Sequence, residues 1–373
     1  MQRLYIVSGN FYDFDNLRPT IGGIQTYILE LIPIFINNGF DDITVFVNDK
    51  YLRTQEEPLY KIVSYNIEEG ADFTKKLASF VKSHIKDPLD LVLYDTDERL
   101  PQGPYFNNLI ALQHGVCWDI PYKTTHSITR MVLSRALRAY KRVRKYSYVK
   151  ALICVDYNFV NWYRTQVDYV KTKLFVIPNN TRIAPVYHKD SKCINIIFAR
   201  RLCWYRGTKV FCNAIIRILE EFSNINVVVA GEGPDEQWLH EQLDGYKNVR
   251  FIKYKSSDSL FIHEDKHIAI VPTIGSEGTS LSLLEAMSAQ CAVIASNVGG
   301  MTNIVLDGYN GLLVEPENAQ DLYTKIKMLL THKEIMEELA TNAYNTVKKA
   351  FSHERWESEW NGVVEEIKTI LEK

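Results

Sequence analysis

The sequence is poor in the features that define several protein classes. Only six of its 373 residues are cysteine, and no two of them form a CxxC pair. Free cysteine in apolar surroundings is usually buried, so we expect neither a structural zinc site nor a disulfide framework. The cysteines are Cys117, Cys154, Cys193, Cys203, Cys212 and Cys291.

Long apolar runs are also lacking. No window reaches the ~18–20 apolar residues of a membrane-spanning helix. The first residues, MQRLYIVSGNFYDFDN, lack the long apolar region and cleavage site of a signal peptide. The net charge is only −2, so no overall field attracts nucleic acid. We therefore expect a cytoplasmic protein, either soluble or peripheral on the inner face of the membrane, with no nucleic-acid partner.

What the sequence does contain is an alternation of strand and helix patterns. With 373 residues, 46% hydrophobic and 24% charged, it has the length of two domains and an ordinary globular composition. In the first half we predict helices over 24–38 and 72–85 and strands over 4–8, 42–47, 89–94, 109–113, 151–155 and 174–177.

The pattern restarts after a polar segment at 178–190. Strands are predicted over 195–199, 226–230, 249–253, 268–272, 292–296 and 311–314, and helices over 208–221, 234–243, 280–288, 319–330, 333–350 and 352–371. This predicts two Rossmann-like, doubly wound α/β domains, 1–182 and 183–351, with a ligand cleft between them. Residues 352–373 are expected to form a last, amphipathic helix that carries Trp356 and Trp360.

The most informative segment is PTIGSEGTSLSLLEAM, residues 272–287, which begins at a strand end and runs into a helix. Glu277 lies in the loop and Glu285 lies inside the helix, in a Glu-x7-Glu spacing. Between them, the backbone N–H groups at the start of the helix suit a phosphate group. The residues that would form this cradle are Gly278, Thr279, Ser280 and Leu281.

These residues, together with the continuation AVIASNVGGMTNIVLDGYNGLLVEP, resemble the retaining glycosyltransferases of the GT-B fold in their Glu-x7-Glu group. This is glycosyltransferase family 4, or glycosyl transferases group 1, and the likeness to its bacterial cell-surface polysaccharide enzymes is strongest over 194–316. The resemblance implies that Glu277 contacts hydroxyls of the donor sugar and that Glu285 binds the ribose of the nucleotide.

The same resemblance covers the basic segment 200–207, Arg-Arg-Leu-Cys-Trp-Tyr-Arg-Gly. The family pattern is Gly-Arg-Leu, three variable residues, then Lys-Gly, and its Arg and Lys neutralise the donor diphosphate. It assigns those roles to Arg201 and Arg206. Arg200 replaces the glycine and Arg206 the lysine, which puts the shape of the loop in question.

Four further expectations follow from the resemblance. The last helix, within residues 352–373, would return to the first domain, with Trp356 and Trp360 as packing anchors. Gly22 and Gly23, before the first helix, would let the backbone approach the donor. His114, just past a strand end, would lie near the donor sugar and the reacting centre. Tyr254 would lie beside the nucleobase.

No metal cofactor is expected. Asp95-Thr-Asp97 matches the sequence of a DxD motif, but it lies in the first half of the chain, so we interpret both acids as loop residues. The resemblance implies a reaction without a divalent metal, in which the departing diphosphate helps to remove the acceptor proton.

A basic segment occupies residues 123–150. From 120 to 155 there are nine Lys or Arg and no Asp or Glu, and part of the stretch, 127–145, has the periodicity of an amphipathic helix. Such a face binds anionic membrane surfaces, which would suit a lipid-linked acceptor. A solvated helix that closes over the acceptor is the alternative.

The expected function is therefore transfer of a sugar from a nucleotide diphosphate-sugar, with UDP as the favoured nucleotide, to a glycan or lipid-linked acceptor. Two alternatives stay open. One is a sugar-nucleotide epimerase of the same fold. The other is a non-catalytic binding subunit, which the departures from the family pattern at Arg200 and Asn303 leave open.

Overall fold

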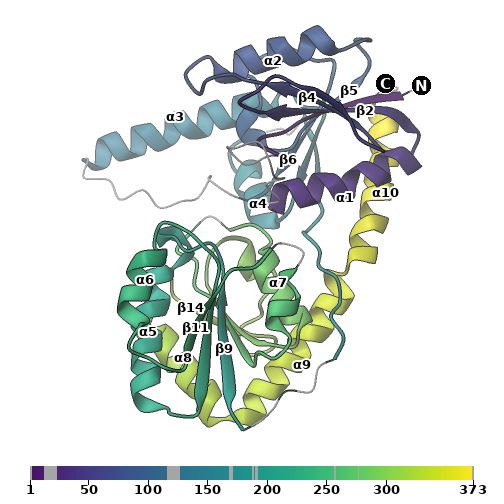
Figure 1. The fold of residues 1–373 in the computed structure, drawn as a ribbon. Coiled ribbons are helices and arrows are strands. Elements are labelled where there is room, and N and C mark those ends of the chain that lie inside the picture. Colours follow the sequence, from purple (N-terminus) through teal and green to yellow (C-terminus); the bar gives the residue numbers. More distant parts are fainter. Residues whose placement is uncertain are drawn as a thin grey trace. The chain divides into compact units, whose positions relative to one another are not determined.

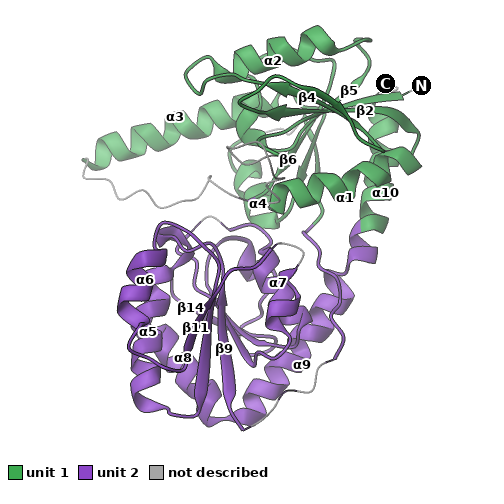
Figure 2. Cartoon of the chain, viewed as in Figure 1, with its two compact units in different colours: residues 1–114, 122–177, 357–373 green, residues 115–121, 178–356 purple. Residues whose placement is uncertain are grey.

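The computed structural model describes residues 2–11, 23–115, 127–167, 171–186, 189, 192–255, 258–275 and 277–371. The chain divides into two compact units (Figure 2). Unit 1 consists of residues 1–114, 122–177 and 357–373, and unit 2 consists of residues 115–121 and 178–356.

Unit 1 is built on an eight-stranded sheet with the order β3-β4-β2-β1-β5-β6-β7-β8. Its neighbouring strands are parallel except for β3 with β4. The strands are β1 (Gln2–Val7), β2 (Phe40–Asn48), β3 (Thr54–Glu56), β4 (Lys61–Tyr65), β5 (Leu91–Tyr94), β6 (Asn108–Gln113), β7 (Ala151–Cys154) and β8 (Lys173–Val176). The helical segments are α1 (Gly23–Asn37), α2 (Phe73–His84), η1 (Asp97–Arg99), α3 (Ile128–Tyr146) and α4 (Tyr157–Arg164).

Unit 2 is built on a six-stranded parallel sheet with the order β11-β10-β9-β12-β13-β14. The strands are β9 (Ile194–Ala199), β10 (Ile225–Ala230), β11 (Val249–Ile252), β12 (Ile268–Val271), β13 (Ala292–Ser296) and β14 (Leu312–Val314). The helical segments are η2 (Trp204–Arg206), α5 (Thr208–Glu221), α6 (Glu236–Leu243), η4 (Phe261–His263), α7 (Leu281–Ser288), η5 (Gly299–Asn303), α8 (Ala319–Thr331), α9 (Lys333–Ala350) and α10 (His353–Leu371), whose C-terminal part counts with unit 1.

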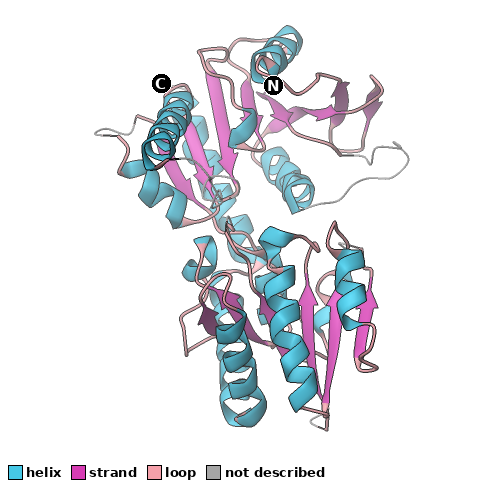
Figure 3. Cartoon of the chain, turned by 90° about the vertical axis from the view of Figure 1, so that its left-hand side faces the viewer, coloured by secondary structure: helices cyan, strands magenta, loops and turns pink. Residues whose placement is uncertain are grey.

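The strands of unit 2 are apolar on both sides because helices cover both faces of the sheet (Figures 1 and 3). Side chains alternate along β9: Ile196 and Phe198 join the core under α5, α6 and α8. Ile197 and Ala199 join the core on the other face, under α7 and α9. The continuous apolar runs of the sequence are the direct consequence of this double coverage.

The C-terminal part of α10 packs on α1 of unit 1. The Trp360 side chain is fully buried, and its indole N–H donates a hydrogen bond to the Tyr27 hydroxyl at 2.9 Å. Asn38 donates to Asn361 at 2.6 Å. Trp356 is buried as well, stacked on His353 in unit 2. The predicted return of the last helix is thus present, and it makes the two chain ends part of one core.

The fold prediction of two doubly wound α/β domains is confirmed, and most predicted elements begin and end within two residues of the observed ones. The β3–β4 pair and α4 were not predicted. β3 is an edge strand of three exposed residues, and such a short polar segment has no periodicity to detect.

Candidate active site

The two central strands of unit 2 mark where a ligand is expected. The chain builds the sheet outward from β9 in one direction and from β12 in the other, so β9 and β12 flank the topological switch point. In open α/β sheets ligands bind at this point, beyond the carboxyl ends of the strands. Arg200 directly follows β9, and Thr273 and Glu277 follow β12.

Glu277 lies at the centre of a buried cluster at this point. Its Oε2 atom accepts hydrogen bonds from Arg200 at 2.8 Å and from the Thr273 hydroxyl at 3.0 Å, and it also pairs with Arg206. Arg200 donates a further hydrogen bond to Thr273. Since all the side-chain contacts described for Glu277 involve Oε2, Oε1 is left for a ligand.

The arginines keep this carboxyl group ionised. Burial alone would raise the pKa of Glu277, but the charges of Arg200 and Arg206 and their hydrogen bonds outweigh that effect and lower the pKa to about 2. Two guanidinium groups against one carboxylate leave the cluster with a net positive charge. The site therefore suits an anionic ligand that also offers hydroxyl groups.

The loop after Glu277 leads into the N-terminus of α7. Gly300 donates its backbone N–H to the Glu277 carbonyl at 2.7 Å, and Asn179 donates to the Thr279 carbonyl at 2.7 Å. A Cβ atom at Gly300 would come within 2.5 Å of the Gly278 backbone, so only glycine fits there. Ser280 is the N-cap residue and Leu281 the first residue of α7, and the Ser280 side chain makes no capping hydrogen bond.

Glu285 lies one turn inside α7 and is only partly exposed. It accepts a hydrogen bond from Ser259 at 2.6 Å. Burial raises its pKa to about 7, against the smaller opposing effect of the Ser259 hydrogen bond. Burial and the Glu285 charge in turn raise the pKa of Tyr254 to about 12, which places Tyr254 in the electrostatic surroundings of Glu285. A half-buried carboxyl of this kind gains from ligand hydroxyls that donate hydrogen bonds to it.

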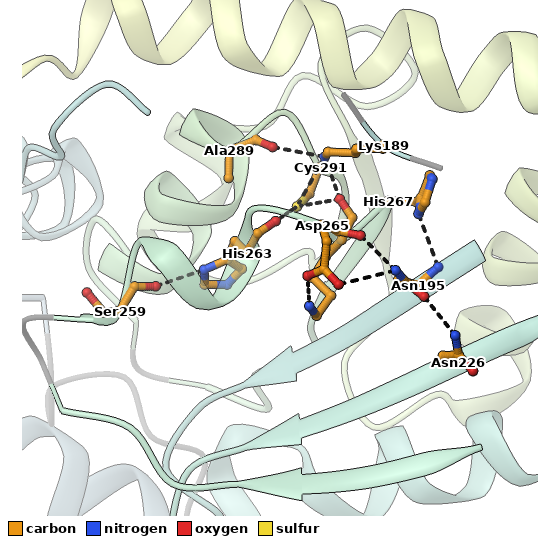
Figure 4. Close-up of polar contacts among 10 residues, drawn as sticks. Lys189, Asn195, Asn226, Ser259, His263, Asp265, His267, Ala289 and Cys291 are labelled. Atoms are coloured by element: carbon orange, nitrogen blue, oxygen red, sulfur yellow. Dashed lines mark hydrogen bonds and ion pairs between the residues drawn. The ribbon is translucent and has the colours of Figure 1, made fainter. Parts of the chain in front are cut away.

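A buried polar cluster at the other end of α7 supports this arrangement (Figure 4). The Lys189 ammonium donates hydrogen bonds to the carbonyls of Ala289 and Gln290, at 2.9 and 2.7 Å, and to that of Lys266. A cation at this position stabilises the C-terminus of a helix. His263, whose pKa burial lowers to about 4, contacts the Ser259 carbonyl at 2.9 Å. The residue that hydrogen-bonds Glu285 is thereby held in place.

The two basic residues that the resemblance assigned to the diphosphate, Arg201 and Arg206, lie in different surroundings. Arg206 ends η2 and pairs with Glu277. Arg201 is exposed, and the buried neighbour of Glu277 is Arg200. Sequence reasoning treated Arg200 only as a departure from the pattern, and it missed Thr273, Ser259, Asn179 and Gly300 as parts of this site.

His114 belongs to unit 1, just past the end of β6. It is buried, and one ring nitrogen bonds the Asp95 backbone carbonyl, while Nε2 is buried without a hydrogen-bond partner among the described residues. Burial lowers its pKa, so the ring is neutral at pH 7. Its edge contacts Tyr27, with ring centroids 5.2 Å apart. A neutral ring with one free nitrogen can exchange a hydrogen bond with a ligand.

Asp95 follows β5 and Asp97 begins η1, so both acids lie in the segment after the strand, as interpreted, but both are buried. Asp95 accepts hydrogen bonds from Ser8 and, at 3.0 Å, from Arg99. Asp97 pairs with Lys145 at 2.9 Å and accepts a hydrogen bond from Tyr146. Both carboxylates face cations, and no group of three His, Cys, Asp or Glu side chains arranged as metal ligands occurs within the described ranges.

Two further predictions meet the structure only in part. Gly22 lies outside the described residues, and Gly23 is the first residue of α1. The basic helix is present as α3, which Figure 1 shows extending away from the sheet of unit 1. Only its last two residues, Lys145 and Tyr146, are buried. Among the described residues, no helix combines the length and the apolarity needed to cross a bilayer.

Comparison with known proteins shows which glycosyltransferases the chain is similar to. Residues 179–346 match the model of the glycosyl transferases group 1 family. This match covers somewhat less than half of the chain. The chain is 25% identical over 356 residues to an uncharacterized glycosyltransferase of Methanocaldococcus jannaschii, covering 90% of this chain and 92% of the relative. It is 30% identical over 156 residues, or 41% of this chain and 40% of the relative, to the N,N'-diacetylbacillosaminyl-diphospho-undecaprenol alpha-1,3-N-acetylgalactosaminyltransferase of Campylobacter jejuni.

Solved structures extend the likeness to the whole fold. Sucrose-phosphate synthase from Thermosynechococcus elongatus superimposes with a TM-score of 0.77 at 16% identity, covering 99% of this chain and all of that one. Anabaena HepE in complex with UDP-glucose superimposes with a TM-score of 0.71 at 13% identity, covering 98% of this chain and 100% of that one. The GT-B fold and the assignment as a glycosyltransferase are confirmed, and the epimerase and binding-subunit alternatives are not favoured.

Proposed function

We propose that this glycosyltransferase moves a sugar from a UDP-sugar to a glycan or lipid-linked acceptor, with retention of the anomeric configuration, in surface polysaccharide biosynthesis on the cytoplasmic face of the membrane. The observation that carries this proposal is the Glu277–Arg206 pair beside the open N-terminus of α7 at the switch point of unit 2. A relative that acts on an undecaprenol-linked sugar supports the acceptor class, and a solved complex with UDP-glucose supports the donor class.

Each part of the donor has a partner in this scheme. The diphosphate lies at the backbone N–H groups of residues 278–281, with Arg206 and the exposed Arg201 as cations. The ribose hydroxyls donate to Glu285, and the base lies beside Tyr254. The sugar hydroxyls bind Oε1 of Glu277, which has no side-chain partner among the described residues, and His114 keeps the role near the donor sugar that the resemblance implies.

The reaction then needs little from the protein besides position and charge. The bond from the anomeric carbon to the diphosphate oxygen breaks as the acceptor oxygen bonds to that carbon from the same face. The acceptor proton passes to the departing diphosphate, whose negative charge Arg206 and the helix N-terminus stabilise. We propose that this cationic site works without a divalent metal, so activity should persist in excess EDTA.

Binding of nucleotides tests the proposal directly. A ligand present at 100 times its Kd stabilises the folded state by about 2.7 kcal/mol. Wild type and Glu285→Ala would be compared by thermal unfolding with a panel of nucleoside diphosphates and their sugars. Stabilisation of wild type by UDP and UDP-sugars, and much less of the variant, supports the proposal. Stabilisation by no nucleotide in the panel contradicts it.

The acceptor side has a separate observation, the exposed face of α3. Five large apolar side chains on this helix are more than half exposed, and the helix carries basic residues but no acidic ones; the apolar residues are Ile128, Val132, Leu133, Leu137 and Tyr140. We propose that α3 binds the anionic membrane surface that holds a lipid-linked acceptor, at about 1 kcal/mol per basic residue near the lipid.

Vesicle sedimentation tests the membrane contact. Wild type should sediment with phosphatidylglycerol vesicles and not with phosphatidylcholine vesicles, and a Leu133→Ser, Leu137→Ser double variant should stay in solution. Since neither leucine is buried, the variant should unfold at the same temperature as wild type. Equal binding of both proteins to both kinds of vesicle would contradict the proposal.

A further inference from the structure

Arg200 occupies the position where the family pattern has glycine, and its side chain is a hydrogen-bonded part of the buried cluster around Glu277. Its side chain is only 4% exposed. It donates one hydrogen bond to the Thr273 hydroxyl and another to Oε2 of Glu277 at 2.8 Å, and Thr273 itself donates to the same Oε2 at 3.0 Å. The three side chains therefore close a ring of hydrogen bonds around one carboxylate oxygen.

Arg206 approaches the same oxygen from a different setting. Its side chain is 21% exposed, against 4% for Arg200, and it ends the short η2 segment beside Tyr205, whose ring centre is 5.3 Å away. It takes no part in the ring with Thr273. Arg206 can therefore leave Glu277 for an anion with little rearrangement, whereas Arg200 cannot leave without breaking two buried hydrogen bonds.

The difference between Arg200 and Arg206 becomes important when the donor binds. A diphosphate in the site competes with Glu277 for Arg206. Without a second partner, Glu277 would then be a buried carboxylate with no cation, a state that costs several kcal/mol or ends in protonation. A protonated or displaced Glu277 could no longer accept hydrogen bonds from the sugar in a fixed direction.

We propose that Arg200 is a positioning residue that holds Glu277 in place and ionised when Arg206 moves to the donor diphosphate. The sugar half of the donor then depends on Arg200, and the diphosphate half depends on Arg206. This inference rests on the proposed function, because it takes the ligand to be a nucleotide diphosphate-sugar.

Calorimetric titration separates the two halves of the donor. The probes are UDP and a panel of UDP-glucose, UDP-galactose, UDP-N-acetylglucosamine and UDP-N-acetylgalactosamine, titrated at pH 7.5 and pH 5.5. The proteins are wild type, Arg200→Met, Arg200→Lys, Arg206→Met and a control, Arg250→Met, which alters an exposed arginine on β11.

Wild type and the control should bind the best UDP-sugar more tightly than UDP. Arg206→Met should weaken UDP itself about tenfold or more, the loss of one charge-assisted contact. Arg200→Met should bind UDP within about threefold of wild type but lose at least about tenfold of the preference for the UDP-sugar. That loss should be larger at pH 5.5, because Glu277 no longer has a permanent cation to oppose its protonation. Arg200→Lys should restore part of the preference.

Three results would overturn the inference. Arg200→Met could weaken UDP as much as Arg206→Met does, which would make Arg200 a direct phosphate ligand. It could leave the preference for the sugar unchanged at both pH values, or wild type could show no such preference. Binding of no probe by wild type would overturn the proposed function itself. Circular dichroism of each variant decides whether a loss reflects unfolding, and Arg200→Lys keeps the test valid if Arg200→Met does not fold.

Discussion

The two units place a buried carboxylate at the same topological position but hold it in different ways. In unit 1 the switch point lies between β1 and β5, and there Asp95 uses both oxygens: Arg99 binds Oδ1, and Ser8 and the Gly9 backbone bind Oδ2. In unit 2 the described side-chain partners of Glu277 all bind Oε2.

This difference separates a structural carboxylate from one that can serve a ligand. Asp95 is satisfied within its unit, and its backbone carbonyl accepts a hydrogen bond from the His114 ring. Among the described residues, Glu277 has side-chain partners only at Oε2, and one of them, Arg206, is partly exposed. Topology therefore locates the polar cluster in each unit, and the distribution of partners decides what the cluster can do.

The largest effect should come from neutralising the carboxylate at each switch point. Glu277→Gln should lower transferase activity about 10²–10³-fold, the usual loss when a group that stabilises the reacting substrate is removed. Asp95→Asn should lower the free energy of unfolding by about 1–3 kcal/mol, because it leaves buried donors poorly paired, with activity within about tenfold of wild type. Initial rates and urea unfolding measure the two effects. Equal losses of activity in two stably folded variants would remove the distinction.

Glycines beside the two clusters provide a second test. A Cβ at Gly300 would meet the Gly278 backbone at 2.5 Å, whereas a Cβ at Gly9 would meet, at the same distance, only the tip of the Arg99 side chain. Gly300→Ala should displace the loop, at a cost of about 1–3 kcal/mol, and weaken UDP binding about tenfold or more. Gly9→Ala should change stability by at most about 0.5 kcal/mol, because Arg99 can move. Similar UDP affinities of the two variants in calorimetry would show that the loop is not held by Gly300.

The two glutamates of the Glu-x7-Glu segment, Glu277 and Glu285, should respond to pH in opposite ways. The pKa of Glu277 is lowered to about 2, so its contribution to stability is present above about pH 4.5 and is lost as the pH falls toward 2. The pKa of Glu285 is raised to about 7, so its ionisation costs stability as the pH rises from about 4.5 through 7.

Glu285→Gln should therefore stabilise the nucleotide-free protein by about 1–3 kcal/mol at pH 8, and by little at pH 4.5. The same change should weaken UDP binding, because an amide is a poorer partner for the ribose hydroxyls than a carboxylate. Thermal unfolding across this pH range, with and without UDP, measures both effects. A variant less stable than wild type at pH 8 would mean that Glu285 is already satisfied without ligand.

The smallest effects should come from the two hydroxyl groups that bind the carboxylates. Ser8→Ala and Thr273→Val each remove one hydrogen-bonding hydroxyl, with an expected cost of about 1 kcal/mol each. Only Thr273→Val should also reduce the preference for a UDP-sugar over UDP, because its partner carboxylate faces the ligand. A matching change in Ser8→Ala would show that the two clusters act together.

Much of the secondary structure could be predicted from the local sequence pattern. The Glu-x7-Glu spacing correctly placed Glu277 in a loop and Glu285 inside α7, because strand, loop and helix signals are encoded by neighbouring residues. Both faces of the unit 2 sheet were predictable from apolar runs such as NIIFA and NVVVA, since parallel strands buried on both sides need no polar face.

The partners of the charged residues could not be predicted from the local sequence pattern. Asp95 and Asp97 were interpreted as loop residues with no predicted partner, yet Asp97 is paired with Lys145 and Tyr146, 48 and 49 residues later in the chain. Arg200 looked like a disturbance of the pattern, yet it is the buried partner of Glu277, 77 residues away.

By itself, then, the sequence determined the two α/β units, their order and the loop–helix segments that carry the two glutamates, because backbone periodicity is a local property. Only the tertiary structure decided which cation meets which carboxylate, and with it that one glutamate is strongly acidic while the other titrates near pH 7. The pKa of a buried group depends on desolvation and on nearby charges, and both come from residues that the fold brings together from distant parts of the chain.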